Sequence, residues 1–439
     1  MKREKKLLVL LAALVALISV TLLVGWLIAG SEKDADSAVF SLDPDKVTKI
    51  WWDYSDEAGF TKVGGSWVYD ADAAFPVNED CLAEMLRVLS SLSPSKTIEN
   101  AKDLDQYGLL YPFCAIKVTV DGTEYQLAIG DQNTISGYRY LSTGDGNVYM
   151  VDNEIASYFA FGPEGAMALE EIPDLSGMTG LKVQSDVQNY EITYEVGSDK
   201  SYSSQHKWFM GNKALDTALT QNLLAVIKDL DWKECVNYNA TDLAAYGLDA
   251  PKAVATAAYL DKTFTLELGD KCDKGVYARI ADSKMVYIVK NEVLDKLLDT
   301  TYSELMPDEV LLMDWDTVTS MDIVLDGNTY TLTQESAQAA GNTTYVWKLG
   351  GAEVKGSNIT QRLDDMATAG YATGLAPELD QQIRFVFYRN DTHHTQVELA
   401  MYGYDSECCL VTLDGVSTVL ADRSDVMALM DEVKNIVLK

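Results

Sequence analysis

Histidine is the scarcest of the residue types that enzymes use as a catalytic base. The 439-residue chain holds only His206, His393 and His394, and it has no Gly-x-Ser-x-Gly segment. A serine or cysteine hydrolase needs a base beside its nucleophile. His393 and His394 follow Asp391 in a predicted hairpin loop, where a weak metal site would lack the further ligands that such sites need. We therefore predict no catalytic, cofactor-binding or metal-binding residues, no cofactor and no enzymatic activity.

Positive charge is scarce beyond the first thirty residues. Without residues 1–29 the chain carries 31 Lys and Arg against 66 Asp and Glu, a net charge near −35. Such a surface repels the phosphates of nucleic acids, and the chain has no glycine-rich loop ending in Lys-Ser or Lys-Thr. Nucleic-acid binding is therefore excluded. Pairs of these carboxylates could serve a glycosidase-type reaction, but the sequence does not give their separation.

Charge of either sign is absent from residues 7–29, a run of 23 residues that follows four basic side chains. A helix of that length reaches about 34 Å, enough for a hydrocarbon core of about 30 Å. Basic flanks stay cytoplasmic, which sends the rest of the chain outward. We predict a cytoplasmic tail at residues 1–6 and a single-pass cell-membrane anchor at residues 7–29. The alternative is a cleaved signal peptide, whose apolar region is normally shorter.

One pattern recurs at a spacing of 138–139 residues. Residues 104–109, which end in Tyr-Gly-Leu, match residues 243–248, and residues 127–131 match residues 266–270, both ending in Gly-Asp. Residues 148–151 likewise match residues 286–289. Three matches at nearly constant spacing indicate a duplicated domain rather than a thin solenoid.

A third copy is indicated by tryptophans at intervals of 141 and 139 residues, Trp67, Trp208 and Trp347. Helical periodicity follows each of them. The apolar stripes are Leu82, Met85, Leu86, Leu89 and Leu92, with Asn78 as N-cap; Leu219, Leu223, Val226, Ile227 and Leu230; and Ile359, Leu363 and Met366, with Ser357 as N-cap.

Each helix is followed by a predicted pair of strands, at residues 115–120 and 124–129, 254–260 and 263–268, and 383–389 and 396–401. Asp121-Gly122 is a strong signal for a tight turn in the first hairpin. Two more strands and a second helix then close each unit, the helices beginning near Asp152, Lys290 and Ala421. Hairpin spacings favour antiparallel pairing.

The predicted fold is therefore α+β: an N-terminal transmembrane helix followed by three duplicated, mainly antiparallel α+β units. Pro44, Pro173 and Pro307 mark the boundaries, because proline disfavours continuation of a helix or strand. We place the first repeat at residues 41–165, the second at 166–302 and the diverged third at 303–439.

The order of these motifs resembles the DUF4340 family of bacterial exported proteins. The residues that carry the resemblance are the two Tyr-Gly-Leu segments, at 107–109 and 246–248, and the strands at 127–131 and 266–270. The third unit offers Tyr371-Ala372-Thr373-Gly374-Leu375 instead. The family has no established activity and supplies no catalytic residues. Members are often associated with genes for gliding-motility-type ABC transporters and their auxiliary membrane proteins.

Each recurring motif also has a structural interpretation, which we favour. Tyr-Gly-Leu suits a helix end capped by glycine, with leucine returning to the core. Gly-Asp at 130–131 and 269–270 suits a turn that ends a strand, in which glycine adopts an unusual backbone angle. Trp51 and Trp52 suit packing on both faces of a strand, with stacking on sugar rings as the alternative. The six cysteines occupy no matching positions and are predicted to be mostly buried free thiols.

These observations and the resemblance together predict a non-enzymatic, extracytoplasmic accessory or scaffold protein of a membrane transporter complex of the ABC type. The expected partners are the membrane, through the N-terminal helix, and a permease or auxiliary subunit. The alternative is a cell-envelope module that binds glycan or another ligand, which exposed aromatic rows on one face would favour. A third alternative is an envelope hydrolase that uses carboxylates.

Overall fold

The computed structural model describes residues 38–438, apart from 91, 340–341 and 371–378. The predicted tail and anchor at residues 1–29 and the Tyr371 to Leu375 segment lie outside the described residues. Across the described ranges, no helix combines the length and the apolar character needed to cross a bilayer.

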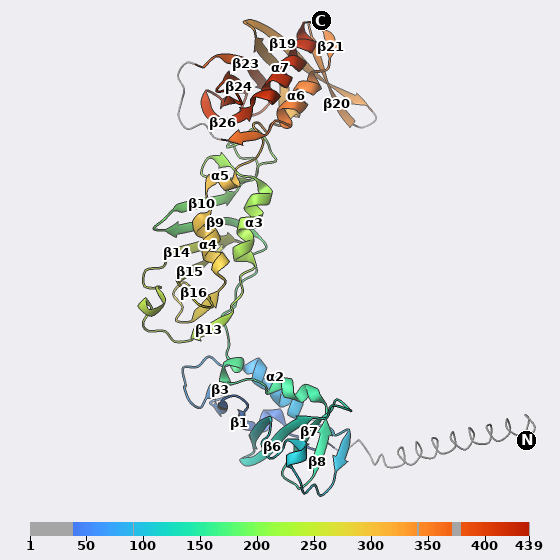
Figure 1. Cartoon of the computed structure of the whole chain (residues 1–439), viewed down its shortest axis with the longest axis vertical. Helices are drawn as coiled ribbons and strands as arrows, with labels where there is room; N and C mark the ends of the chain where they lie inside the picture. Colours follow the sequence, from blue (N-terminus) through green and yellow to red (C-terminus); the bar gives the residue numbers. More distant parts are fainter. Residues whose placement is uncertain (1–37, 91, 340–341, 371–378, 439) are drawn as a thin grey trace, which may run out of the picture. The chain divides into compact units, whose positions relative to one another are not determined.

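The first sheet has eight strands in the order β3-β2-β1-β5-β6-β7-β8-β4, and every neighbouring pair is antiparallel (Figure 1). Its strands are β1 (Val47–Asp53), β2 (Glu57–Val63), β3 (Ser66–Tyr69), β4 (Lys96–Ile98), β5 (Cys114–Val120), β6 (Thr123–Gln132), β7 (Arg139–Ser142) and β8 (Val148–Val151). Its helices are α2 (Glu79–Ser90) and the 3-10 turns η1 (Pro44–Lys46), η2 (Asp105–Tyr107), η3 (Asn153–Tyr158) and η4 (Pro163–Ala166).

The second sheet has nine strands in the order β12-β11-β10-β9-β14-β15-β16-β17-β13. Its strands are β9 (Met178–Ser185), β10 (Asn189–Tyr194), β11 (Trp208–Met210), β12 (Lys213–Ala214), β13 (Glu234–Asn237), β14 (Ala253–Tyr259), β15 (Lys262–Cys272), β16 (Gly275–Ile280) and β17 (Val286–Val289). Its helices are α3 (Thr217–Lys228), η5 (Ala244–Tyr246), α4 (Asn291–Asp299) and α5 (Tyr302–Leu305).

The third sheet has nine strands in the order β21-β20-β19-β18-β23-β24-β25-β26-β22. Its strands are β18 (Val318–Leu325), β19 (Asn328–Ala339), β20 (Asn342–Leu349), β21 (Ala352–Val354), β22 (Thr368–Gly370), β23 (Gln381–Arg389), β24 (Gln396–Gly403), β25 (Cys408–Leu413) and β26 (Val416–Asp422). Its helices are η6 (Trp315–Thr317), α6 (Gly356–Asp364) and α7 (Arg423–Val437).

The three sheets share one topology, as internal repetition requires. In each, the strands before the first long helix run outward from the centre as a meander. The strand after that helix crosses to the opposite edge, and a second meander fills the space between. The chain is thus mainly β with some helices. Each sheet falls within one of the three predicted ranges, and the exact boundaries stay predictions.

The predicted hairpins are confirmed to within a few residues. Asp121 and Gly122 both have positive φ, at 49° and 79°, as a tight two-residue hairpin turn requires. The central hairpin of the second repeat uses the same device at Leu260-Asp261, and in the third repeat the β18–β19 and β25–β26 hairpins use it at Asp326-Gly327 and Asp414-Gly415.

The predicted helices are also present, with three corrections. Asn78 caps α2, because its side chain accepts from the backbone N–H of Cys81 at 3.0 Å. Ser357 is not an N-cap but lies inside α6, which Lys355 precedes. Leu219 is 39% exposed and faces away from the core of its repeat. The helix expected near Asp152 is only the 3-10 segment η3.

Each sheet buries one face beneath its helices. In the second repeat, Leu223 and Ile227 of α3 and Leu294 and Leu297 of α4 join sheet residues in one cluster. In the third, α6 and α7 complete the same kind of core. The recurrent tryptophans occupy equivalent strands, β3, β11 and β20, and are 7%, 3% and 3% exposed. They are core residues.

The chain divides into two compact units, one ending at Glu171 and the other spanning Ile172–Lys439. The first unit contains the first repeat, and the second contains the other two. The outermost strands of the three sheets, β3 and β4, β12 and β13, and β21 and β22, are only two to four residues long.

Candidate functional site

The Tyr-Gly-Leu motif forms the same turn in the first two repeats. Tyr107 and Tyr246 end the 3-10 turns η2 and η5, and the glycine that follows each has φ near +64°, at 63° and 65°. Leu109 and Leu248 then return to the interior, where they are 7% and 1% exposed. The predicted glycine-capped turn is confirmed.

The Gly-Asp motif does not end a strand, and that prediction was wrong. β6 continues to Gln132 and β15 to Cys272, with a β-bulge at the motif. Neither Gly130 nor Gly269 has a positive φ. Glycine is needed there for a different reason, because a Cβ would collide with the carbonyl oxygen of the tyrosine in Tyr-Gly-Leu.

The two motifs therefore pack directly against each other. The Asp131 carboxylate covers Gly108, and that of Asp270 covers Gly247. A ring contact completes the arrangement, since Tyr107 meets Tyr140 edge-on at 4.9 Å and Tyr246 meets Tyr277 at 5.1 Å. The motifs that identify the repeats are thus used in internal packing. Any difference of function between repeats has to come from what surrounds them.

In the first repeat this turn is surrounded by exposed apolar side chains. Leu110 and Tyr111, directly after the turn, are 58% and 84% exposed, and Ile135 in the β6–β7 hairpin is 97% exposed. Tyr54, 40% exposed, packs its ring against Phe113 at 4.9 Å. We call Tyr54, Leu110, Tyr111, Phe113 and Ile135 the apolar end of the first repeat.

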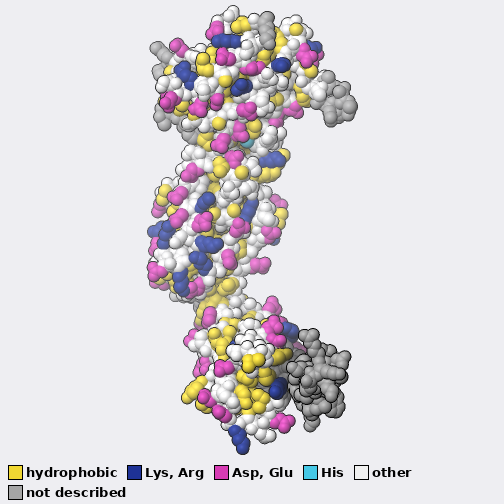
Figure 2. All heavy atoms as spheres, turned by 45° about the vertical axis from the view of Figure 1, so that its right-hand side comes forward, with side chains coloured by type: hydrophobic (Ala, Val, Ile, Leu, Met, Phe, Trp, Pro, Cys, Tyr) yellow, Lys and Arg dark blue, Asp and Glu magenta, His cyan; other side chains and the backbone are white. Residues whose placement is uncertain are grey.

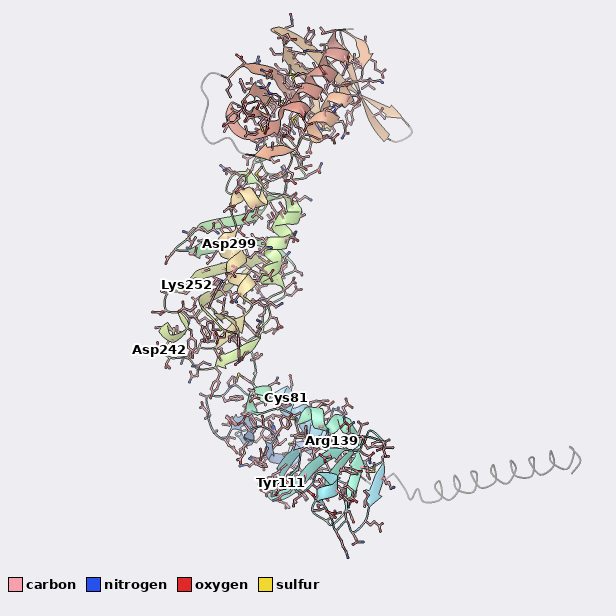
Figure 3. The ribbon with its side chains drawn as sticks, viewed as in Figure 1. Cys81, Tyr111, Arg139, Asp242, Lys252 and Asp299 are labelled. Atoms are coloured by element: carbon pink, nitrogen blue, oxygen red, sulfur yellow. The ribbon has the colours of Figure 1, made fainter. Side chains whose placement is uncertain are left out.

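Arg139 holds the apolar end together from beneath. Its guanidinium lies 4.4 Å from the centre of the Phe113 ring, a cation–π contact. Its Nη1 donates to the carbonyl of Gly130 at 2.9 Å and its Nε to Asn153 Oδ1 at 2.9 Å. Tyr111 and Arg139 are labelled in Figure 3. Arg139, at the start of β7, thus contacts the bulge, η3 and the segment after the turn.

The matching positions in the second repeat are polar. Asp249 and Ala250 stand where the first repeat has Leu110 and Tyr111, and Lys252, labelled in Figure 3, stands where it has Phe113. Lys252 pairs with Asp270 at 3.3 Å. The hairpin is two residues shorter, and its Lys274 pairs with Glu234 at 2.5 Å. Figure 2 shows hydrophobic side chains gathered on the visible face of the first unit and mixed charges over that of the middle repeat.

The connection between β10 and β11 is a second feature by which the first two repeats differ. In the first repeat the equivalent connection is the two-residue turn Gly64-Gly65, whereas in the second it is a loop of residues 195–207. We call it the clasp loop, because it binds the third repeat. The Tyr202 hydroxyl donates to Asp414 at 2.8 Å, and Ser203 Oγ donates to Asp314 at 2.7 Å.

Arg389 receives the clasp loop on the third repeat. Its side chain is 1% exposed, and its Nη2 donates to the carbonyl of Tyr202 at 2.8 Å. Its Nε donates to Thr317 Oγ1 at 2.9 Å. Burial is the main cause that raises the pKa of Tyr202, followed by its hydrogen bond to Asp414. Arg389 thus bonds neutral acceptors on two repeats and also pairs with Asp391 at 3.9 Å, which makes this junction a structural contact.

All three histidines lie at this junction. His206 is bonded to Ser201 at 2.7 Å within the clasp loop, and burial lowers the pKa of its imidazole. His394 meets the carbonyl of Asp199 at 2.8 Å and the ring of Tyr202 at 4.8 Å. His393 and His394 lie in the predicted hairpin loop, where both backbone N–H groups donate to Asp391. Among the described residues, no group of His, Cys, Asp and Glu is arranged to hold a metal ion.

A shallow groove between α3 and α4 in the second repeat holds several carboxylates. It encloses about 460 Å³ and is lined by Glu292, Asp295, Asp299 and Glu304, with Lys296 among them. Asp295 is already paired with Lys271 at 2.5 Å. Neither histidine nor cysteine lines the groove among the described residues. It therefore offers a charged, open surface.

The remaining candidate residues have structural surroundings. Trp52 is fully buried and donates its indole N–H to the carbonyl of Phe161 at 2.7 Å. Trp51, on the other face of β1, lies under the ammonium of Lys117 at 4.3 Å. None of the six cysteines, all of which lie among the described residues, forms a disulfide; Cys114 and Cys409 are buried, and the other four are partly buried.

Comparison with known proteins agrees with this geometry. The family model described as a domain of unknown function, DUF4340, matches residues 67–198 and 211–381. The chain belongs to the DUF4340 family. Each matched segment begins at or just after a recurrent tryptophan and ends within the next repeat, so the DUF4340 sequence unit is offset from the folded repeat. No curated protein and no solved structure matches the chain.

Two features of this surface were not found by sequence reasoning. The apolar end could have been seen by setting residues 107–113 beside residues 246–252, which differ only after Tyr-Gly-Leu. The clasp loop could have been found from the number of residues between the two strands that it connects, which is much larger in the second repeat than in the first. Both signals are differences between the repeats, whereas a recurring motif is by definition what the repeats share.

Proposed function

We propose that this DUF4340 protein is a non-enzymatic accessory subunit of a membrane transporter complex of the ABC type. Residues 7–29 anchor it in the cell membrane, and the three repeats lie on the extracytoplasmic side. The association of the family with such transporters supports the class of complex, and the uncharged 23-residue run supports the anchor.

The observation that carries the proposal is the contrast between the first two repeats. They share their core and the packing of Tyr-Gly-Leu on Gly-Asp, yet one surrounds that turn with exposed apolar residues and the other with ion pairs. Large exposed apolar groups on a strongly acidic domain mark interaction surfaces. A duplicated domain whose copies keep the fold and change the surface suits a scaffold.

The anchor also serves this function physically. Tethering a binding domain to the membrane confines it near other membrane proteins and raises its effective concentration there. A weak surface contact on the first repeat, which directly follows the anchor in the sequence, then suffices for a stable complex.

The proposal is tested by purifying the protein with its partners. The full chain, tagged at its C-terminus, is extracted from native membranes in mild detergent, and the recovered proteins are identified by mass spectrometry. We expect a permease and an ATPase in fixed ratio. The matched control carries a cleavable signal peptide in place of residues 1–30 and should appear in the soluble fraction without them. Recovery of the full chain alone, from a monodisperse extract, would contradict the proposal.

A further inference from the structure

The members of the apolar end are linked to one another by ring contacts, by hydrogen bonds and by the chain itself. Leu110 and Tyr111 connect Tyr107 to Phe113, whose ring touches Tyr54 and Arg139. Asn133 turns the hairpin that carries Ile135, accepting from its backbone N–H at 3.0 Å. The Asn133 amide also donates to the Tyr140 hydroxyl at 2.6 Å, and the Tyr140 ring packs on Tyr107. The exposed side chains thus stand on one hydrogen-bonded framework.

Folding does not require these side chains to be apolar. The second repeat builds the same turn, bulge and tyrosine contact with Asp249, Ala250 and Lys252 at the matching positions. The exposed side chains of Leu110 and Tyr111 lower solubility. They add little to the stability of the core, because both point away from it. Their presence is explained by a contact outside the repeat.

The charge around the apolar end selects the kind of partner. Residues 41–171 carry 22 Asp and Glu against 8 Lys and Arg, a net charge of −14. Asp53, Asp103, Asp105 and Asp131 lie close to it in the sequence. A second copy of this chain and an anionic bilayer would both be repelled. A protein surface with an apolar centre and a basic rim would be attracted.

Glycan is a poorer match than protein for this surface. Sugars stack on flat, open aromatic faces, but the Phe113 ring is covered by Arg139 and flanked by Tyr54. The most exposed members, apart from Tyr111, are the aliphatic Leu110 and Ile135. Aliphatic and tyrosine side chains together are typical of the centre of a protein interface.

We propose that the apolar end, residues Tyr54, Leu110, Tyr111, Phe113 and Ile135, is the docking surface for a partner protein whose contact face is apolar and rimmed by lysine and arginine. This inference rests on the proposed function and assigns the surface by which the accessory subunit contacts its transporter. Leu110 and Tyr111 supply the central contacts, and the surrounding carboxylates supply attraction and orientation.

The test replaces the two central residues by those of the second repeat, Leu110→Asp with Tyr111→Ala. Because the second repeat folds with these residues, the variant should keep the wild-type melting temperature. We expect the transporter subunits recovered with the tagged full chain to fall at least about tenfold. Val63→Asp is the matched control, since Val63 is an exposed apolar residue of the same repeat, 61% exposed, and lies outside the apolar end. It should leave recovery unchanged.

A photo-crosslinking amino acid at position 111, compared with one at position 63, identifies the occupant. Crosslinking of position 111 to a transporter subunit, at a site bordered by Lys or Arg, supports the inference. Products with a second copy of this chain, with lipid or with cell-wall glycan would overturn it. So would undiminished recovery with the double variant, which leaves the proposed function standing. If the wild-type chain itself recovers no transporter, the proposed function fails as well.

Discussion

In the first repeat, the Asp131 carboxylate fills the space that a side chain on Gly108 would need. A Cβ on residue 108 would lie 2.6 Å from Asp131 Oδ1, closer than real Cβ atoms approach. The second repeat has the same relationship, with Asp270 Cγ 2.6 Å from the Cβ position of Gly247. Tyr-Gly-Leu and Gly-Asp therefore recur at one spacing because the two motifs pack against each other in both repeats.

Gly108→Ala should destabilise the first repeat by about 2–4 kcal/mol, since it adds left-handed backbone strain to an overpacked contact. Gly122→Ala is the control, because Gly122 also has a positive φ but nothing lies within 4 Å of its Cβ position. It should cost only about 1 kcal/mol. Denaturant unfolding of the two variants measures the difference, and equal losses would show that the contact with Asp131 is unimportant.

Trp208→Ala should cost about 3–5 kcal/mol, because it removes a large side chain that is 3% exposed in the core of the second repeat. Tyr111→Ala, at an 84% exposed position, should change stability by less than about 0.5 kcal/mol. Both are measured by chemical denaturation. Wild-type stability in Trp208→Ala, together with lost partner binding, would show that this tryptophan serves an interface.

Tyr202→Ala should release the clasp loop from the third repeat. The substitution removes the hydroxyl that bonds Asp414 and the ring that packs on His394. Trypsin should then cut after Lys200 or Lys207 at least several-fold faster, since proteolysis follows the population of the open form. Val196→Ala, at a 72% exposed position of the same loop, should be cut at the wild-type rate. Equal rates for both variants would contradict the contact.

Stability should fall as the pH drops below about 6.5, and part of that fall should come from His206. Burial lowers the pKa of this imidazole in the folded chain, opposed by Glu309, Asp216 and Asp314. The unfolded chain therefore binds the proton first, and stability decreases as pH falls through the unfolded pKa. Urea unfolding between pH 8 and 5.5 should show a smaller decrease for His206→Gln. An identical decrease would remove His206 as a cause.

Two of the six thiols should resist modification in the folded protein. Burial raises the pKa of Cys114 to about 12, and Cys409 is 1% exposed, with its pKa also raised by burial. Maleimide at pH 7.5 should leave both unlabelled, whereas all six should react in denaturant. Mass spectrometry locates the labels. Rapid labelling of Cys114 without denaturant would show that the first sheet opens readily.

Much of the fold could be predicted because its signals are local. Asp121-Gly122 specifies a hairpin turn, and the alternation around it specifies two strands within a few residues of β5 and β6. Helix ends were harder, since Ser357 has the chemistry of an N-cap but the chain enters α6 two residues earlier. The need for glycine at position 130 could not be predicted, because the atom that leaves no room for a Cβ there is the carbonyl oxygen of Tyr107, which is distant in sequence.

The candidate surfaces depended on tertiary structure for the same reason. In the sequence, Leu110 and Tyr111 look like any other apolar pair next to a turn. Only the exposed fractions of their side chains distinguish them from core residues. Arg389 ends a strand in the sequence, and nothing local indicates that Tyr202, 187 residues earlier, provides its hydrogen-bond acceptor. Local patterns predict elements well, but exposure and long-range pairing decide which residues remain available for partners.

The short outermost strands have a consequence for recognition. A partner that bound by adding a strand would need a long row of unpaired backbone N–H and C=O groups, which is the usual template for strand addition and for aggregation. Outermost strands of two to four residues offer very little of it. Pairing through backbone hydrogen bonds tolerates almost any partner sequence, whereas contacts between side chains distinguish one partner from another. Because the outermost strands are so short, we expect partners to be selected mainly by exposed side chains, which can change one at a time in evolution.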